Sequence, residues 1–167
     1  MELKKAFGML KKSEVFRRWE REHKKAYLCS CFVVIGKTLV HSELSNWQFD
    51  FYYGGNINSF VLSQDGRTRT VEKDKAFKEK EAKITPLNLE DVKINLDDAF
   101  KIVCKLEEAK GLGFEKKIVV VQDLGYGAIW NLSMITDSFS VLNTKISAKN
   151  GKVISKEIFS LLSLKAG

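Results

Sequence analysis

This sequence of 167 residues lacks several features, and each absence excludes a class of protein. It has one proline, Pro86, and no Gly- or Ser-rich run, so no flexible linker divides it. Three cysteines, Cys29, Cys31 and Cys104, give no disulfide framework, which suits a reducing compartment. The longest apolar run, 27–36, is far shorter than the ~20 residues of a membrane-spanning helix. With no apolar leader at the N-terminus either, the sequence predicts a cytoplasmic location.

Catalytic and cofactor-binding motifs are also absent. The glycine turns at 111–113 and 125–127 match neither the phosphate-binding loop nor the dinucleotide-binding pattern. The two histidines, His23 and His41, have no G-x-S-x-G nucleophile motif to accompany them. We therefore predict that the chain is not an enzyme and holds no cofactor.

A zinc site is the metal hypothesis that the sequence allows. Cys29, Cys31, His23 and His41 could supply four ligands, but C-x-C differs from the usual C-x2-C spacing. Two cysteines in an apolar strand are better interpreted as small core residues. Cys104 lies on the apolar stripe of a predicted helix, and we expect it in the core as well. The sequence thus predicts no metal site and no reactive thiol.

The composition is that of a globular protein with one basic end. Hydrophobic residues make up 44% and charged residues 29%. Of the net charge of +7, residues 1–25 contribute the larger part, with nine Lys or Arg and four Glu. This segment gives an alternative function, the binding of nucleic acid or an anionic membrane surface, whereas the interleaved glutamates favour a solvated helix face. The candidate basic residues are Lys4, Lys5, Lys11, Lys12, Arg17, Arg18, Arg21, Lys24 and Lys25.

The first half is expected to be helical and then to form strands. Apolar spacing changes phase near Ser13, which predicts a short leading helix or arm and then a packing helix over 13–25. Alternation and turn residues predict four strands, over 27–36, 45–53, 57–63 and 67–73.

One of these strands carries a row of aromatic residues. They alternate with Gln48 and Asp50, as expected of a half-buried strand whose aromatic side faces a core. If some rings are exposed, a groove for a peptide or apolar ligand becomes the alternative. The candidate groove residues, including one from the second half, are Trp47, Phe49, Phe51, Tyr53 and Trp130.

The second half repeats this order. A charged connector, 74–83, and an extended lead-in, 84–94, precede a helix that Asn95 caps and that a glycine at 111 or 113 ends. Four strands are then expected over 116–123, 128–135, 137–147 and 152–162.

The two halves can be placed in register. Trp47 aligns with Trp130, Gly66 with Gly151, and the helix around Trp19 with Phe100–Val103. A chance match between segments rich in hairpins is the alternative. Duplication predicts an α+β protein of two tandem units, 1–83 and 84–167, each with a helix on a four-stranded antiparallel sheet and packed into one compact domain.

The second half also resembles the PepSY-type domains, which share a cystatin-like helix-on-sheet architecture. The resemblance is carried by VKINLDDAFKIV (92–103) and TKISAKNGKVISKEI (144–158). It implies a non-catalytic binding or regulatory module, as those domains often accompany peptidases or lie in membrane-anchored proteins. The expected partner is a protein or peptide, bound at a sheet edge or an aromatic groove.

Overall fold

The computed structural model describes residues 1–37, 46–71 and 84–162. Some features expected from the sequence lie outside the described residues: His41 and the charged connector 74–83. The boundary expected between the two units, at 83/84, falls at their border. The helical elements are α1 (Leu3–Lys12), α2 (Glu14–Glu22), the 3-10 turn η2 (Leu89–Asp91), α3 (Leu96–Cys104) and the 3-10 turn η3 (Glu107–Ala109). The strands are β1 (Tyr27–Gly36), β2 (Trp47–Tyr53), β3 (Asn56–Leu62), β4 (Thr68–Val71), β5 (Phe114–Asp123), β6 (Ala128–Thr136), β7 (Ser140–Ser147) and β8 (Val153–Ser160).

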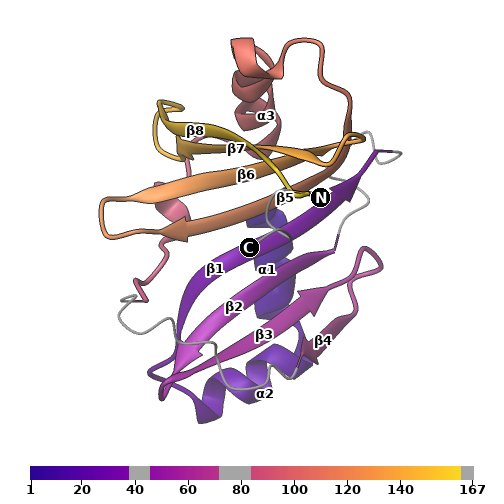
Figure 1. The fold of residues 1–167 in the computed structure, drawn as a ribbon. Helices are drawn as coiled ribbons and strands as arrows, with labels where there is room; N and C mark the ends of the chain where they lie inside the picture. Colours follow the sequence, from indigo (N-terminus) through magenta and orange to yellow (C-terminus); the bar gives the residue numbers. More distant parts are fainter. Residues whose placement is uncertain (38–45, 72–83, 163–167) are drawn as a thin grey trace.

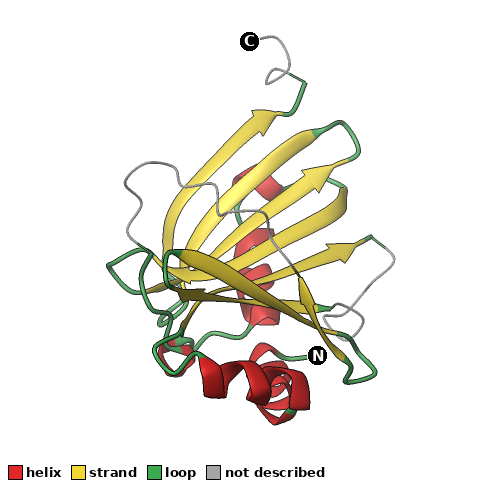
Figure 2. Ribbon diagram, turned by 90° about the horizontal axis from the view of Figure 1, so that it is seen from below, coloured by secondary structure: helices red, strands yellow, loops and turns green. Residues whose placement is uncertain are grey.

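All eight strands form one twisted sheet in the order β4-β3-β2-β1-β5-β6-β7-β8, and each neighbouring pair is antiparallel. The three α-helices lie on one side of this sheet (Figures 1 and 2). The expected α+β class is therefore confirmed.

The strand order is symmetric about the contact between β1 and β5. From that contact the chain runs outward through β2, β3 and β4 on one side and through β6, β7 and β8 on the other. The two central strands pair over seven residues each, from Ser30 opposite Gln122 to Gly36 opposite Lys116. Two four-stranded meanders are thus joined edge to edge into a single sheet.

The leading helix packs against the sheet and is not an arm. Leu3, Ala6 and Leu10 are buried and lie on one face of α1, as their spacing requires. At Ser13 the hydroxyl accepts a hydrogen bond from the amide of Phe16 at 3.3 Å, which caps α2 as expected. Both helices therefore belong to the packed layer.

The helix that matches α3 is α1, so the expected alignment of Trp19 with Phe100 is wrong. Leu96, Ala99 and Val103 are the buried residues of α3, and their spacing is that of the buried residues of α1. Trp19 lies on α2, which has no counterpart among the helices of the described second half.

One tryptophan in each half ties its matching helix to the sheet. In the first half, Trp47 Nε1 donates to the carbonyl oxygen of Met1 at 2.8 Å. In the second half, Trp130 Nε1 donates to the carbonyl oxygen of Ile94 at 2.9 Å. Each acceptor lies two residues before its helix, so the same contact fixes the start of both helices.

The β3–β4 and β7–β8 hairpins both turn at a glycine, although the first turn is one residue shorter. Gly66 and Gly151 have φ of 81° and 77°, a region that glycine occupies at little cost. Their amides donate to the carbonyl oxygens of Ser63 and Ser147, at 3.0 and 2.9 Å. The glycine turns, the tryptophan contacts and the strand order agree with a duplication, which stays a prediction.

These glycines offer a matched stability test. A Cβ at position 151 would lie 2.9 Å from Cδ1 of Ile102, whereas one at position 66 would lie 3.4 Å from Cε of Met9. Since an L-residue at positive φ costs about 1 kcal/mol, we expect Gly66→Ala to lower the free energy of unfolding by about 1 kcal/mol and Gly151→Ala by about 2 kcal/mol. Urea denaturation of the two variants measures this difference, and equal losses would contradict it.

The helix α3 is shorter than expected, and this exposes Cys104. The helix ends at Cys104, where the amide of Lys105 bonds back to the carbonyl of Ile102 at 3.2 Å and Leu106 turns to extended backbone. Val103 is buried under the helix while Cys104 is exposed. The expectation that Cys104 packs in the core is wrong, because its position falls beside the buried stripe at the last turn.

Candidate functional site

The aromatic row of β2 belongs to the core and does not line an exposed groove. Phe16 and Trp19 of α2 pack on it, with ring centroids 4.9 and 5.5 Å from that of Phe51. Only Tyr53, at the end of the strand, is exposed, and its ring lies edge-on to His23. The remaining candidate groove residues are buried, and these are Trp47, Phe49, Phe51 and Trp130.

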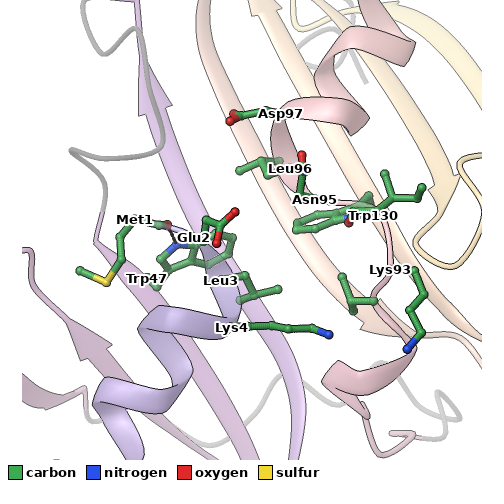
Figure 3. Close-up of a pocket in the computed structure, with 12 residues that line it drawn as sticks. Met1, Glu2, Leu3, Lys4, Trp47, Lys93, Asn95, Leu96, Asp97 and Trp130 are labelled. Atoms are coloured by element: carbon green, nitrogen blue, oxygen red, sulfur yellow. Dashed lines mark hydrogen bonds between the residues drawn. The ribbon is translucent and has the colours of Figure 1, made fainter.

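Two of these tryptophans border a small cavity of about 180 Å³ between the first turns of α1 and α3 (Figure 3). Lys4 and Lys93 line it together with the acidic residues Glu2 and Asp97, so no single charge predominates. Ligand sites are usually about 300–1,000 Å³. The cavity is too small for most ligands, and the indole N–H groups that face it are already bonded to backbone.

No α-helix of the described residues lies on the opposite side of the sheet, and we call the centre of that side the helix-free face. This face is defined by four side chains of the central strands: Phe32 and Val34 of β1, and Ile118 and Val120 of β5. Phe32 pairs with Val120 and Val34 pairs with Ile118, and none of the four is fully buried. Between them in the chain, Val33 and Val119 point to the helix side and are buried.

A polar cluster flanks the helix-free face on the first half of the sheet. The carboxylate of Asp50 accepts hydrogen bonds from Ser30 Oγ at 2.9 Å, Gln48 Nε2 at 2.8 Å and Ser59 Oγ at 2.6 Å. Asp50 and Ser59 are buried. Three strands are therefore held in register by one carboxylate, which gives this flank a fixed array of polar groups.

A second polar cluster flanks the face on the other half. Asn143 Nδ2 donates to Asn131 Oδ1 and to Ser133 Oγ, both at 2.8 Å. Asn143 lies opposite Ser133 just as Ser59 lies opposite Asp50. The apolar centre is thus bordered on both sides by side chains held by hydrogen bonds.

The thiols and histidine of the zinc hypothesis do not form a site in the described residues. Burial raises the pKa of Cys31 well above its usual range, and the charges of Asp50 and Cys29 raise it further. His23 stacks on Trp19, and its Nδ1 lies 2.8 Å from the Trp19 carbonyl oxygen, to which it donates. No cluster of potential metal ligands occurs among the residues that the structure describes.

The nine candidate basic residues are all exposed on the helical layer or directly after it. Three form ion pairs with acidic residues: Lys11 with Glu20, Arg18 with Glu14 at 3.4 Å, and Lys4 with Glu90 at 3.8 Å. The pairs are solvent-exposed and contribute little stability. The others make no ion pair with any described residue, and these are Lys5, Lys12, Arg17, Arg21, Lys24 and Lys25.

Comparisons with known proteins bear on the fold only. No protein-family model and no curated protein matches the chain. A crystal structure from Clostridium difficile 630, of a protein described as a "putative lipoprotein", is similar with a TM-score of 0.56 and 11% sequence identity. The similarity covers 87% of this chain and 91% of the other. At this identity it supports the α+β architecture, and the resemblance to PepSY-type domains stays a prediction.

None of the described helices has the length and apolar character needed to cross a membrane.

The helix-free face is the surface that the sequence reasoning missed. The signal was present in residues 31–35 and 118–121, which are apolar without a break. In antiparallel strands with one solvated face, apolar and polar residues normally alternate, whereas near-continuous apolar runs are typical of strands buried on both sides. The helices cover one side of β1 and β5, and the apolar runs of these strands are typical of strands that are covered on the other side as well.

Proposed function

We propose that this protein is a non-catalytic binding module that engages a protein partner through the helix-free face. The single observation that carries the proposal is the apolar centre of that face on β1 and β5, at positions where an antiparallel sheet facing water would carry polar side chains. Burying Phe32, Val34, Ile118 and Val120 against a partner would remove this apolar surface from water.

The shape and chemistry of the face favour a protein over a small molecule. It is the broad side of a sheet, with an apolar centre and hydrogen-bonded polar flanks, which is the usual anatomy of a protein interface. The flanking groups of Asp50 and Asn143 are already held in place, so little side-chain freedom would be lost on binding.

A regulatory role, including the regulation of a peptidase, is the form of this function that the PepSY resemblance supports. Those domains are non-catalytic and are thought to inhibit or regulate. The cytoplasmic location inferred from the sequence stays part of this proposal.

The proposal is tested by placing a photo-crosslinking amino acid at Val34 and, as a matched control, at the exposed Val15 of the helical layer. We expect a discrete cross-linked partner from the native lysate at position 34 and none at position 15. Val34→Glu should then weaken binding of that purified partner at least 100-fold, about 2.8 kcal/mol, because an unpaired charge would be buried. Val15→Glu should leave binding unchanged. Equal cross-linking at the two positions would refute the proposal.

A second candidate function is the binding of nucleic acid or an anionic surface by the basic residues of α1 and α2. The observation that favours it is that all nine are exposed and six make no ion pair with a described residue. Phosphate contacts release counterions, so affinity should fall steeply with salt.

This second function predicts a measurable salt slope. If Lys12, Arg17 and Arg21 each contact a phosphate of duplex DNA, reversing them to Glu should reduce the slope of log K against log [salt] by about 3. Fluorescence anisotropy with labelled DNA and RNA, and co-sedimentation with anionic vesicles, provide the readouts. A variant that binds each of them as the parent does would exclude this function.

A further inference from the structure

The two edges of the sheet differ in how they are protected. The edge strand β4 has four residues, Thr68–Val71, and α2 packs beside it. The opposite edge strand, β8, has eight residues and no neighbouring strand on its outer side in the described chain (Figure 1). Natural edge strands are usually short, charged or covered, because a free edge can pair with another chain. The edge strand β8 is long, and no described strand or helix pairs with or covers its outer side.

Apolar side chains are exposed along this free edge. Ile154, Ile158 and Phe159 of β8 have exposed fractions of 43%, 52% and 38%. Leu162, just after the strand, is also exposed. A strand that added to β8 would pair with backbone groups on its outer side and cover these side chains at once.

A groove lies at the start of β8, between the β5–β6 and β7–β8 turns. Its volume is about 410 Å³, and it is lined by Tyr126, Ile129 and Ile154 together with Lys149 and Lys152. Tyr126 is 63% exposed, which leaves its ring available for contact.

The charge around the edge is distributed unevenly. Lys156, in the middle of β8, is held 2.6 Å from Glu108, and this hydrogen bond lowers the pKa of the Glu108 carboxyl. Lys149 and Lys152 are exposed and make no ion pair with any described residue. Asp91 is the acidic residue that lines the same groove. A net positive charge therefore remains at the end of the edge where β8 begins.

We propose that β8 accepts an extended acidic segment of another protein as a ninth, antiparallel strand. Apolar residues of that segment cover Ile154, Ile158 and Phe159. Because an antiparallel segment ends where β8 begins, acidic residues near its carboxyl end reach Lys149 and Lys152. This surface is distinct from the helix-free face, and the inference goes beyond the function proposed above.

A second copy of this chain fits the edge less well. In symmetric antiparallel pairing centred on the strand, residues of the same face lie opposite one another, which places Lys156 against Lys156 or Glu157 against Glu157. Like charges directly opposite each other destabilise a sheet. The charge pattern thus favours a foreign acidic segment.

The experiment selects a displayed library of random 12-residue peptides on the intact chain. We expect the enriched peptides to carry apolar residues on both faces of the added strand, because Ile158 and Phe159 point to opposite faces, and to carry Asp or Glu near the carboxyl end. A synthesised consensus peptide should bind at least tenfold more weakly to Lys149→Glu/Lys152→Glu and to Ile158→Lys. The matched control Lys24→Glu/Lys25→Glu, on exposed residues away from β8, should bind within twofold of the parent. Hydrogen exchange should slow at amides of β8.

Several outcomes would overturn the inference. It fails if no peptide is enriched, if binding survives both Lys149→Glu/Lys152→Glu and Ile158→Lys, or if the enriched peptides lack acidic residues. It also fails if sedimentation shows a dimer that Ile158→Lys dissociates, because the occupant is then a second copy. The Val34→Glu variant should bind the peptide as the parent does, which separates this result from the fate of the helix-free face. Circular dichroism verifies that Lys149→Glu/Lys152→Glu and Ile158→Lys fold. If one of them does not fold, the binding measured with the other still tests the inference.

Discussion

Replacing Trp130 with alanine is expected to lower the free energy of unfolding by about 4 kcal/mol, the usual cost of removing a large buried aromatic side chain. Its side chain is fully buried in the core. Its indole nitrogen also donates to the carbonyl of Ile94, two residues before α3. The substitution therefore leaves a cavity, an unpaired carbonyl and a helix that has lost its tie to the sheet.

The matched substitution is Trp47→Ala, which removes the same contact from α1. Because both tryptophans are buried and bonded alike, we expect losses within about 1 kcal/mol of each other. Trp130→Phe should cost roughly 1–2 kcal/mol, since a ring remains but the hydrogen bond is lost. Urea denaturation and thermal melting measure these values, with a shift in Tm of roughly 10 °C for the alanine variants. A loss below about 2 kcal/mol at either alanine variant would contradict the role given to these residues.

Local signals in the sequence predicted most of the elements. Alternation around Asp50 predicted β2, the Asn95 cap predicted the start of α3, and the glycines at 66 and 151 predicted two turns. Each of these signals arises from backbone geometry or from one buried side of an element, and both can be read within a few residues.

The correspondence of α1 with α3 could not be predicted from such local signals. Leu3, Ala6 and Leu10 have the same spacing as Leu96, Ala99 and Val103, yet the first segment was predicted only as a short leading helix or arm, and the helix around Trp19 was aligned with Phe100–Val103 instead. Lys4 and Lys5 lie between the first three apolar residues. Those lysines lie on the outer face of α1 and do not affect its buried face. Net charge over a segment is a poor guide to packing when the charged and apolar residues occupy different faces.

The candidate groove failed for a related reason. Alternating aromatics show that one side of β2 is apolar, but the covering layer decides whether that side is core or groove. Phe16 and Trp19 provide the cover, and they lie more than 25 residues earlier in the chain. Tertiary contacts of this kind are outside the reach of periodicity.

The central strands of this sheet differ from the flanking strands in the side chains that they carry on the helix-free side. The central pair, β1 and β5, carries apolar residues on both sides, whereas the flanking strands carry polar clusters on the helix-free side. If duplication produced this arrangement, the two ancestral edges met and became the centre of one sheet, and the former outer faces merged into one broader surface. Joining two units edge to edge also leaves only β4 and β8 as edges.

The polar cluster at Asp50 gives the second large expected effect. Asp50→Ala should lower the free energy of unfolding by about 3 kcal/mol, because it removes the acceptor of Ser30, Gln48 and Ser59, and an unsatisfied buried donor costs about 1–3 kcal/mol. Asp50→Asn should cost less, about 1–2 kcal/mol, because one carbonyl oxygen is kept while the amide group faces donors. Asn143→Ala, in the half-buried cluster across the face, is the matched control and should cost about 1 kcal/mol. Chemical denaturation of the three variants gives the comparison. If Asp50→Ala were as stable as the parent, the carboxylate would not hold the three strands, and the polar flank of the helix-free face would have to be reinterpreted as an adaptable surface.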